Sequence, residues 1–209
     1  NPTFFSLWIG NNDVLGYATS GGDGSNPITS EALFTQAYNG LIATLTSNGA
    51  KGVVANIPNV TAIPFFTTVP YNPVPLDAAS VTALNQQVFG PLKQILTAYG
   101  QGSRLNLVKA TQNPVLLKDE SLTNLSAEIT TALVAAGVPA QQAGLMGIVY
   151  GQARHATSAD LLPLTTSSVI GTAPSSPYAV APFNKYGVTF PLDDKHVLSS
   201  TEKDEVLAA

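Results

Sequence analysis

The chain has 209 residues, a formal net charge of −4 and only nine Lys and Arg residues, so it lacks the basic surface that a nucleic-acid partner requires. The absence of cysteine excludes disulfides and thiolate metal sites, and no apolar run approaches the roughly 18 residues of a transmembrane helix. Charged residues make up 11% of the chain, against about 25% in an average soluble domain. We therefore expect a secreted or periplasmic protein with a single α/β domain over residues 1–209.

The first expected element is a buried strand over residues 4–9, Phe-Phe-Ser-Leu-Trp-Ile. Because this strand opens the chain without a preceding Met or signal-like sequence, we expect a missing N-terminal segment of the same protein upstream. A helix with one apolar face follows, with Thr29 or Ser30 as its N-cap, and a second buried strand covers residues 52–57. This order predicts a βαβ unit with parallel strands and an exposed or partner-filled position beside the first strand.

The remainder of the chain alternates between helices, short strands and loops. Predicted helices cover residues 78–99, with an interruption at Gly90-Pro91, residues 126–136, and a C-terminal segment that begins with a capping box at Ser199-x-x-Glu202. Two further strands are expected at residues 105–110 and 115–118, and their pairing is left open. Loops rich in Pro, Ser or Thr cover residues 58–75 and 158–182.

The first candidate motif is Gly10-Asn11-Asn12-Asp13, which stands where the opening strand ends. In parallel α/β sheets the functional crevice lies outside the carboxyl ends of the strands, so polar side chains at this point are placed for chemistry. Gly, Asn and Asp are also the ordinary residues of turns, and a simple turn is the alternative interpretation.

The second candidate motif is Asp193-Asp194-Lys195-His196, directly before the terminal helix. An imidazole that acts as a general base needs a carboxylate at Nδ1, and Asp193, three residues before His196, is better placed for this than Asp194. The alternative is a solvated loop histidine whose spacing to Asp193 is coincidental.

Together, the two motifs resemble the SGNH (GDSL-like) lipase/acylhydrolase family, in which a Gly-x-Asn-Asp block follows a central strand and an Asp-x-x-His block lies near the C-terminus. The resemblance implies a three-layer α/β/α, flavodoxin-like fold with a mostly parallel sheet, here missing its first strand. It also implies that Asn12 donates its amide to the oxyanion hole, that Asp193 orients His196, and that His196 activates a serine. Of the segments that carry the resemblance, Gly10 to Asp13 is the specific match.

The serine block of that family, Gly-Asp/Asn-Ser-Leu, is absent from these residues. Ser20, Ser25 and Ser103 lack the strand-to-helix setting of a nucleophile, so the serine is expected upstream and this chain alone is expected to be inactive. The expected activity of the complete protein is hydrolysis of a carboxylic ester, with a small-molecule ester, a lipid or an acylated sugar as substrate. The alternative is a non-catalytic SGNH-like module that binds lipid or carbohydrate, or has a structural role.

Three further expectations concern geometry and ligands. If the two motifs form one site, the Asn12 and His196 side chains should lie within roughly 10 Å, and Asp193 within about 3.2 Å of His196 Nδ1. His155 has Gln152 at the position where a catalytic histidine would need a carboxylate, so we expect His155 at the surface. The two histidines do not have the spacing of metal ligands, so we expect neither a metal nor another cofactor. Residues 58–75 and 158–182 are expected to line the cleft, through the aromatic residues Phe65, Phe66, Tyr71 and Tyr178.

Overall fold

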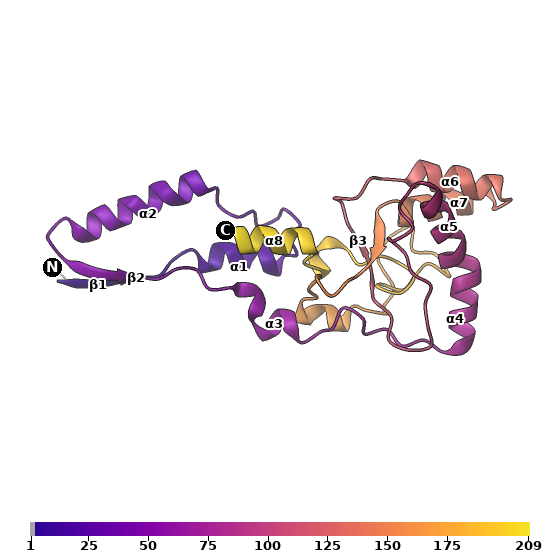
Figure 1. Ribbon diagram of the computed structural model, residues 1–209, viewed down its shortest axis with the longest axis horizontal. Coiled ribbons are helices and arrows are strands. Elements are labelled where there is room, and N and C mark those ends of the chain that lie inside the picture. The colour runs from indigo at the N-terminus through magenta and orange to yellow at the C-terminus, as the bar shows by residue number, and fades with distance from the viewer. Residues whose placement is uncertain (1–2) are drawn as a thin grey trace.

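A computed structural model describes residues 3–209 and shows a mixed α/β chain in which a βαβ unit projects from a larger body of helices, long loops and one short pair of strands (Figure 1). The strands are β1 (Phe4–Leu7), β2 (Lys51–Val54), β3 (Leu116–Lys118) and β4 (Ala153–His155). The α-helices are α1 (Asn11–Thr19), α2 (Glu31–Thr46), α3 (Pro64–Thr67), α4 (Ala78–Leu84), α5 (Gly90–Ala98), α6 (Ser126–Ala135), α7 (Ala140–Tyr150) and α8 (Ser200–Ala208). Within residues 3–209 the strands form two separate two-stranded sheets.

The order and parallel pairing of the predicted βαβ unit are confirmed, but the prediction that its strands are buried is wrong: every residue of β2 is exposed, and β1 alternates between exposed and half-buried residues. β1 and β2 are parallel, with Phe4 opposite Lys51 and Leu7 opposite Val54, and α2 connects them. α2 begins after Ser30, one of the two predicted N-caps. The unit forms because two short runs of apolar residues flank a segment with helical periodicity.

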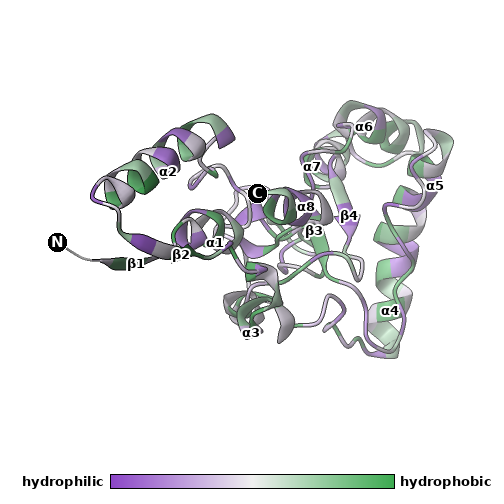
Figure 2. Ribbon diagram, turned by 60° about the vertical axis from the view of Figure 1, so that its left-hand side comes forward, coloured by the Kyte–Doolittle hydropathy of each residue, from purple (hydrophilic) through white to green (hydrophobic). Residues whose placement is uncertain are grey.

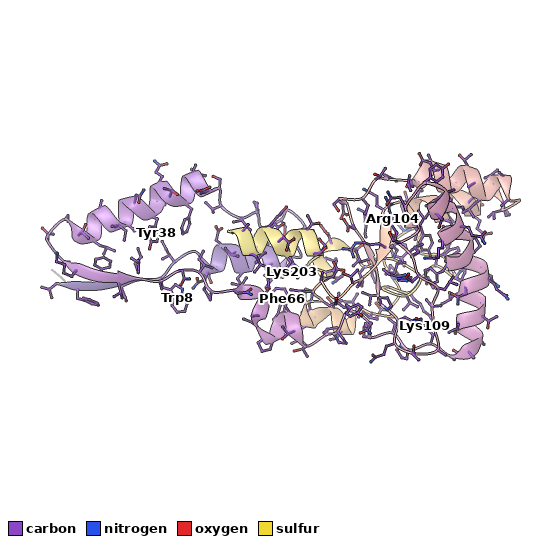
Figure 3. The ribbon with its side chains drawn as sticks, viewed as in Figure 1. Trp8, Tyr38, Phe66, Arg104, Lys109 and Lys203 are labelled. Carbon is purple, nitrogen blue, oxygen red and sulfur yellow. The ribbon has the colours of Figure 1, made fainter. Side chains whose placement is uncertain are left out.

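This two-stranded sheet is open. Within the described residues β1 pairs only with β2, and α2 has no fully buried residue. Tyr38 of α2 lies on one side of the strands and Trp8 on the other (Figure 3), and Figure 2 shows apolar residues along β1. Phe4, Val53 and Trp8 are 60%, 57% and 61% exposed. Because β1 has no second neighbour among the described residues, the predicted exposed position beside the first strand is confirmed. Parallel sheets normally have both faces covered, and here both faces also carry exposed apolar side chains.

Helices α1 and α8 join the βαβ unit to the body and lie side by side in opposite directions (Figure 1). Their contact is apolar and buries Val14 and Tyr17 of α1 together with Val206 of α8. The start of α8 is fixed by the predicted capping box, in which Ser199 and Glu202 each bond the other's backbone N–H.

The predicted helix over residues 78–99 is present, and its interruption at Gly90-Pro91 is a local π-helical turn. α4 passes through the π-helical segment Asn85–Phe89 into α5 without a break in the chain of helical turns. Pro91 has no N–H to donate to the preceding turn, and a change of hydrogen-bond spacing next to a proline is a common way to retain the helix.

The predicted strand over residues 105–110 is wrong, whereas residues 115–118 contain β3. β3 pairs antiparallel with β4. Side chains take the place of a neighbouring strand at residues 105–110. The Asn85 side chain both accepts from the Val108 N–H and donates to the Val108 carbonyl, at 2.8 and 2.9 Å. The Asn106 N–H donates to the His155 ring. Side chains therefore provide hydrogen bonds to backbone groups of this segment that a neighbouring strand would otherwise provide.

The body is built around an apolar core. Helices α6 and α7 pack against one another and both contribute buried side chains to this core. Phe89, Leu92 and Tyr150 are fully buried there, and the Tyr150 hydroxyl donates to the Thr189 carbonyl at 2.7 Å. α7 was not foreseen as a separate helix. In the described part of the chain, no helix has both the length and the apolar character needed to cross a bilayer.

The prediction that His155 lies at the surface is wrong. His155 is 5% exposed, its Nδ1 accepts the Asn106 N–H at 2.9 Å, and its ring packs against Phe89. Burial lowers the pKa of His155 to about 4, and the neighbouring ammonium of Lys93 acts in the same direction. His155 is therefore a neutral core residue and not a candidate for the site.

We expect this burial to make the protein sensitive to mild acid. The unfolded chain binds a proton at His155 below a pKa of 6.5 and the folded chain only below about 4, so the free energy of unfolding should fall by about 3 kcal/mol across this window. His155→Asn retains an acceptor for Asn106 and cannot titrate. Urea denaturation at a series of pH values should show a smaller decline for the variant than for the wild type. Equal declines would contradict the assignment.

Candidate active site

The Gly10 to Asp13 motif begins α1 at the carboxyl end of β1. Gly10 has a left-handed backbone, with φ of 96°, and a Cβ at this position would lie 2.7 Å from the Ile57 side chain, so only glycine fits. Its carbonyl accepts the N–H groups of Asp13 and Val14, at 3.1 and 3.2 Å. The motif is therefore a strand-to-helix junction, with its polar residues in the first turn of the helix.

The three polar side chains of this motif have different environments. Asp13 accepts hydrogen bonds from the backbone and hydroxyl of Thr29, both at 3.0 Å, and thereby holds the segment that leads into α2. Asn11 Oδ1 is buried and has no hydrogen-bond partner among the described residues. Asn12, the predicted oxyanion donor, is exposed. Of the three, Asn12 has the accessible amide that the predicted role requires.

Asp193 and His196 lie in the segment before α8, but they do not form the predicted hydrogen bond. Asp193 instead accepts the Tyr186 hydroxyl at 2.6 Å, and the Tyr186 ring packs edge-on against His196 at 6.0 Å between centroids. No carboxylate bonds the His196 ring within the described residues. Asp194 lies beside Glu202.

The electrostatic surroundings of His196 favour its neutral form. Partial burial lowers its pKa, the adjacent Lys195 lowers it further, and Asp193 acts in the opposite direction with a smaller effect. A neutral imidazole is the form that accepts a proton, so His196 is in the protonation state of a general base near neutral pH. No serine hydroxyl in the described chain bonds this ring; Ser20 donates to the Tyr17 carbonyl and Ser25 to Asp23.

The structure does not bring Asn12 and His196 together. Gly21, just beyond the end of α1, packs against the carbonyls of Asp194 and Val197, whereas Asn12 stands at the start of the same helix. At a rise of 1.5 Å per residue, the nine steps from Asn12 to Gly21 correspond to about 13 Å along α1. Figure 1 shows α1 beside α8. α1 and α8 are antiparallel and start at opposite ends of their contact, so no contact joins Asn12 to the segment of His196 among the described residues, and the distance of roughly 10 Å between their side chains stays a prediction.

A group of carboxylates between the end of α1 and the start of α8 was not predicted from the sequence. Asp194 and Glu202 face one another, with Glu205 and Tyr17 nearby, and the Tyr17 hydroxyl donates to Glu205. Burial, together with the charge of Glu202, raises the pKa of Asp194 to about 7. In residues 3–209 no group of three or more His, Cys, Asp or Glu residues is arranged to hold a metal ion. Because Asp194 interacts with Glu202, it is not the carboxylate that orients His196.

A cleft of about 650 Å³ lies between residues 68–76 and residues 164–171, with Lys185 and Val188 at its side. Both segments belong to the loops expected to line a cleft. The aromatic residues expected there do not line it: Phe66 is buried near α1 and α8, and Tyr178 is exposed elsewhere. The walls are aliphatic and proline residues instead.

Comparisons of this chain with protein-family models, curated proteins and solved structures give no match.

Proposed function

We propose that this chain is the part of an SGNH-type carboxylic ester hydrolase that carries the oxyanion donor and the general base. The observation that carries the proposal is the position of Gly10 to Asp13 directly after a parallel strand, β1, whose second edge is open. In the proposed complete protein, a strand outside these residues pairs with β1, completes a three-layer parallel sheet and presents the serine beside Asn12. A secreted or periplasmic location remains a prediction from composition.

The proposed reaction is acyl transfer through a covalent intermediate. The serine oxygen attacks the ester carbonyl carbon while His196 takes the hydroxyl proton, and the Asn12 amide donates to the oxyanion that forms. Collapse of this intermediate breaks the bond to the alcohol, which leaves with the proton from His196. Water, deprotonated by His196, then attacks the acyl-enzyme and releases the carboxylic acid, with the serine regaining its proton.

This mechanism requires a different arrangement of the two motifs from the one described. Asn12 must approach His196, and Asp193 must exchange the Tyr186 hydroxyl for the His196 ring. Asn12 is linked to β1 through only a few residues, so a strand that pairs with β1 acts directly on the position of α1. We propose that this pairing brings the start of α1 to the loop that carries His196.

We expect the 209-residue chain to hydrolyse nitrophenyl acetate and nitrophenyl butyrate no faster than the same chain after heat denaturation, at equal concentration. The reason is that neither a serine nucleophile nor an assembled pair of Asn12 and His196 is present in the described arrangement. Absorbance at the nitrophenolate band measures turnover. Turnover that a serine-directed inhibitor abolishes would show that a serine within the chain is the nucleophile.

The second candidate is a non-catalytic module that retains the SGNH scaffold and binds a lipid or a carbohydrate. Two observations favour it: the Tyr186 hydroxyl holds Asp193 away from His196, and the length of α1 separates Asn12 from His196. Treating the natural protein that contains these residues with a fluorophosphonate distinguishes the two candidates, because only a serine hydrolase becomes covalently labelled.

A further inference from the structure

We infer that the cleft between residues 68–76 and 164–171 binds a linear aliphatic carboxylate, with its chain against the cleft walls and its carboxylate at Lys185. This inference goes beyond the proposed hydrolysis, because the site requires neither a serine nor His196. The cleft volume of about 650 Å³ lies within the range of about 300–1,000 Å³ that is typical of small-molecule sites.

The first wall of the cleft is held in place by backbone contacts to the body. Val69 forms a bridge with Leu162, and Val74 exchanges backbone hydrogen bonds with Asn113 at 2.8 and 3.3 Å. Between these anchors the Tyr71 carbonyl accepts the Val115 N–H at 2.9 Å. Pro70, Pro73 and Pro75 fix φ along the same segment, so little conformational entropy remains to be lost when a ligand binds.

The second wall is the 3₁₀ turn Leu164–Ser168 and the residues that follow it. Three residues per turn place Leu164, Ser167 and Ile170 on one side, and all three line the cleft. Thr166 points the other way, and its hydroxyl donates to the His196 carbonyl at 2.8 Å. The cleft and His196 therefore lie on opposite sides of the same turn, and the cleft is a separate site.

The lining favours an aliphatic chain over a sugar. It consists mainly of Val, Leu, Ile and Pro side chains, and it includes no aromatic ring and no Asn, Gln, Asp or Glu. A sugar presents several hydroxyl groups that need such partners, and without them their desolvation costs free energy. An alkyl chain needs only apolar surface, which the two walls supply.

Lys185 is the single charged residue of the lining. Its carbonyl accepts the N–H groups of Val188, Thr189 and Phe190, at 3.1, 3.0 and 2.9 Å, so its backbone is fixed beside the cleft. Its ammonium group takes part in no ion pair among residues 3–209. Although the chain has a net charge of −4, no carboxylate lines the cleft, and the local charge is complementary to an anionic head group.

Isothermal titration of the 209-residue chain with dodecanoate, below its micelle concentration, tests this inference. Lys185→Gln should weaken dodecanoate binding at least about tenfold, because a hydrogen bond to a charged group is lost, and should leave dodecanol binding unchanged. Lys185→Arg should restore dodecanoate binding. Lys195→Gln, which changes an exposed lysine outside the cleft, is the matched control and should bind both ligands as the wild type does.

Ile170→Trp, which fills the cleft, should abolish binding of dodecanoate and dodecanol, with circular dichroism confirming that the variant is folded. The inference is overturned if the wild type binds no dodecanoate, if Lys185→Gln and Lys195→Gln weaken binding equally, or if Lys185→Gln has no effect. These measurements use a chain without the proposed serine, so a result that overturns dodecanoate binding does not affect the hydrolase proposal. In the same way, absence of esterase activity in the natural protein would not affect the inference of carboxylate binding.

Discussion

Replacement of Arg154 by Met is expected to lower the free energy of unfolding by about 3–5 kcal/mol. The Arg154 guanidinium bonds Asp119 at 2.6 Å and both oxygens of Asp160 at 2.7 Å, and the Asp160 side chain is completely buried. Asp160 also accepts the backbone N–H groups of Thr157 and Ser200, so it connects β4 with the start of α8. Removal of Arg154 leaves two buried carboxylates without their counter-charge.

The same network gives the protein a second dependence on acid. Burial alone would raise the pKa values of Asp119 and Asp160, but hydrogen bonds from Ser121, Arg154 and Thr157 outweigh it, and both pKa values are lowered. Because the folded pKa is below the unfolded value, this stability is present above about pH 4 and is lost as the pH falls through the folded pKa. Arg154→Met should therefore move the acid transition to higher pH.

Chemical denaturation between neutral and acid pH measures both effects. Lys118→Met is the matched control, since it removes the Lys118–Glu120 ion pair, in which both side chains are about half exposed. That variant should change the free energy of unfolding by less than about 1 kcal/mol. If the two substitutions cost the same small amount, the Arg154 network does not stabilise the fold in the way described.

In the natural protein that contains these residues, His196→Gln is expected to lower kcat for ester hydrolysis on the order of 10³-fold, with little change in KM. Gln occupies a similar volume but cannot take the serine proton. Lys195→Gln, at the neighbouring exposed position, should retain kcat within a few-fold. Steady-state kinetics with nitrophenyl butyrate measure both variants. Equal kcat values for His196→Gln and the wild type would remove His196 from the mechanism.

Local sequence patterns predicted the βαβ unit and the start of α8 because neighbouring residues alone determine them. Apolar runs define β1 and β2, and the Ser199 and Glu202 pair satisfies the first N–H groups of α8 wherever that helix lies. The open edge beside β1 followed from the same reasoning. Its exposed Phe4 shows that these residues alone do not cover the sheet.

Features that depend on distant residues could not be predicted in this way. His155 is buried because Asn106 and Phe89 surround it, and residues 105–110 remain outside a sheet because Asn85 binds their backbone. The spacing of Asp193 and His196 gave no information on Tyr186, which competes for the carboxylate.

The predicted site was only partly informative for the same reason. The sequence placed Asn12 after a strand and His196 before a helix, and both positions are confirmed. The relative direction of α1 and α8, which decides the distance between them, depends on packing among Val14, Tyr17 and Val206. The aliphatic lining of the cleft likewise could not be predicted, because it depends on the packing of two loops that are distant in sequence.

The most direct test of the proposed function is to label the natural protein with a fluorophosphonate and to locate the modified residue by mass spectrometry. We predict one modified serine, outside the 209 residues described, and loss of labelling in His196→Gln and in the presence of a competing ester. A modified serine within these residues, labelling that His196→Gln does not change, or an intact protein that is not labelled at all would contradict it.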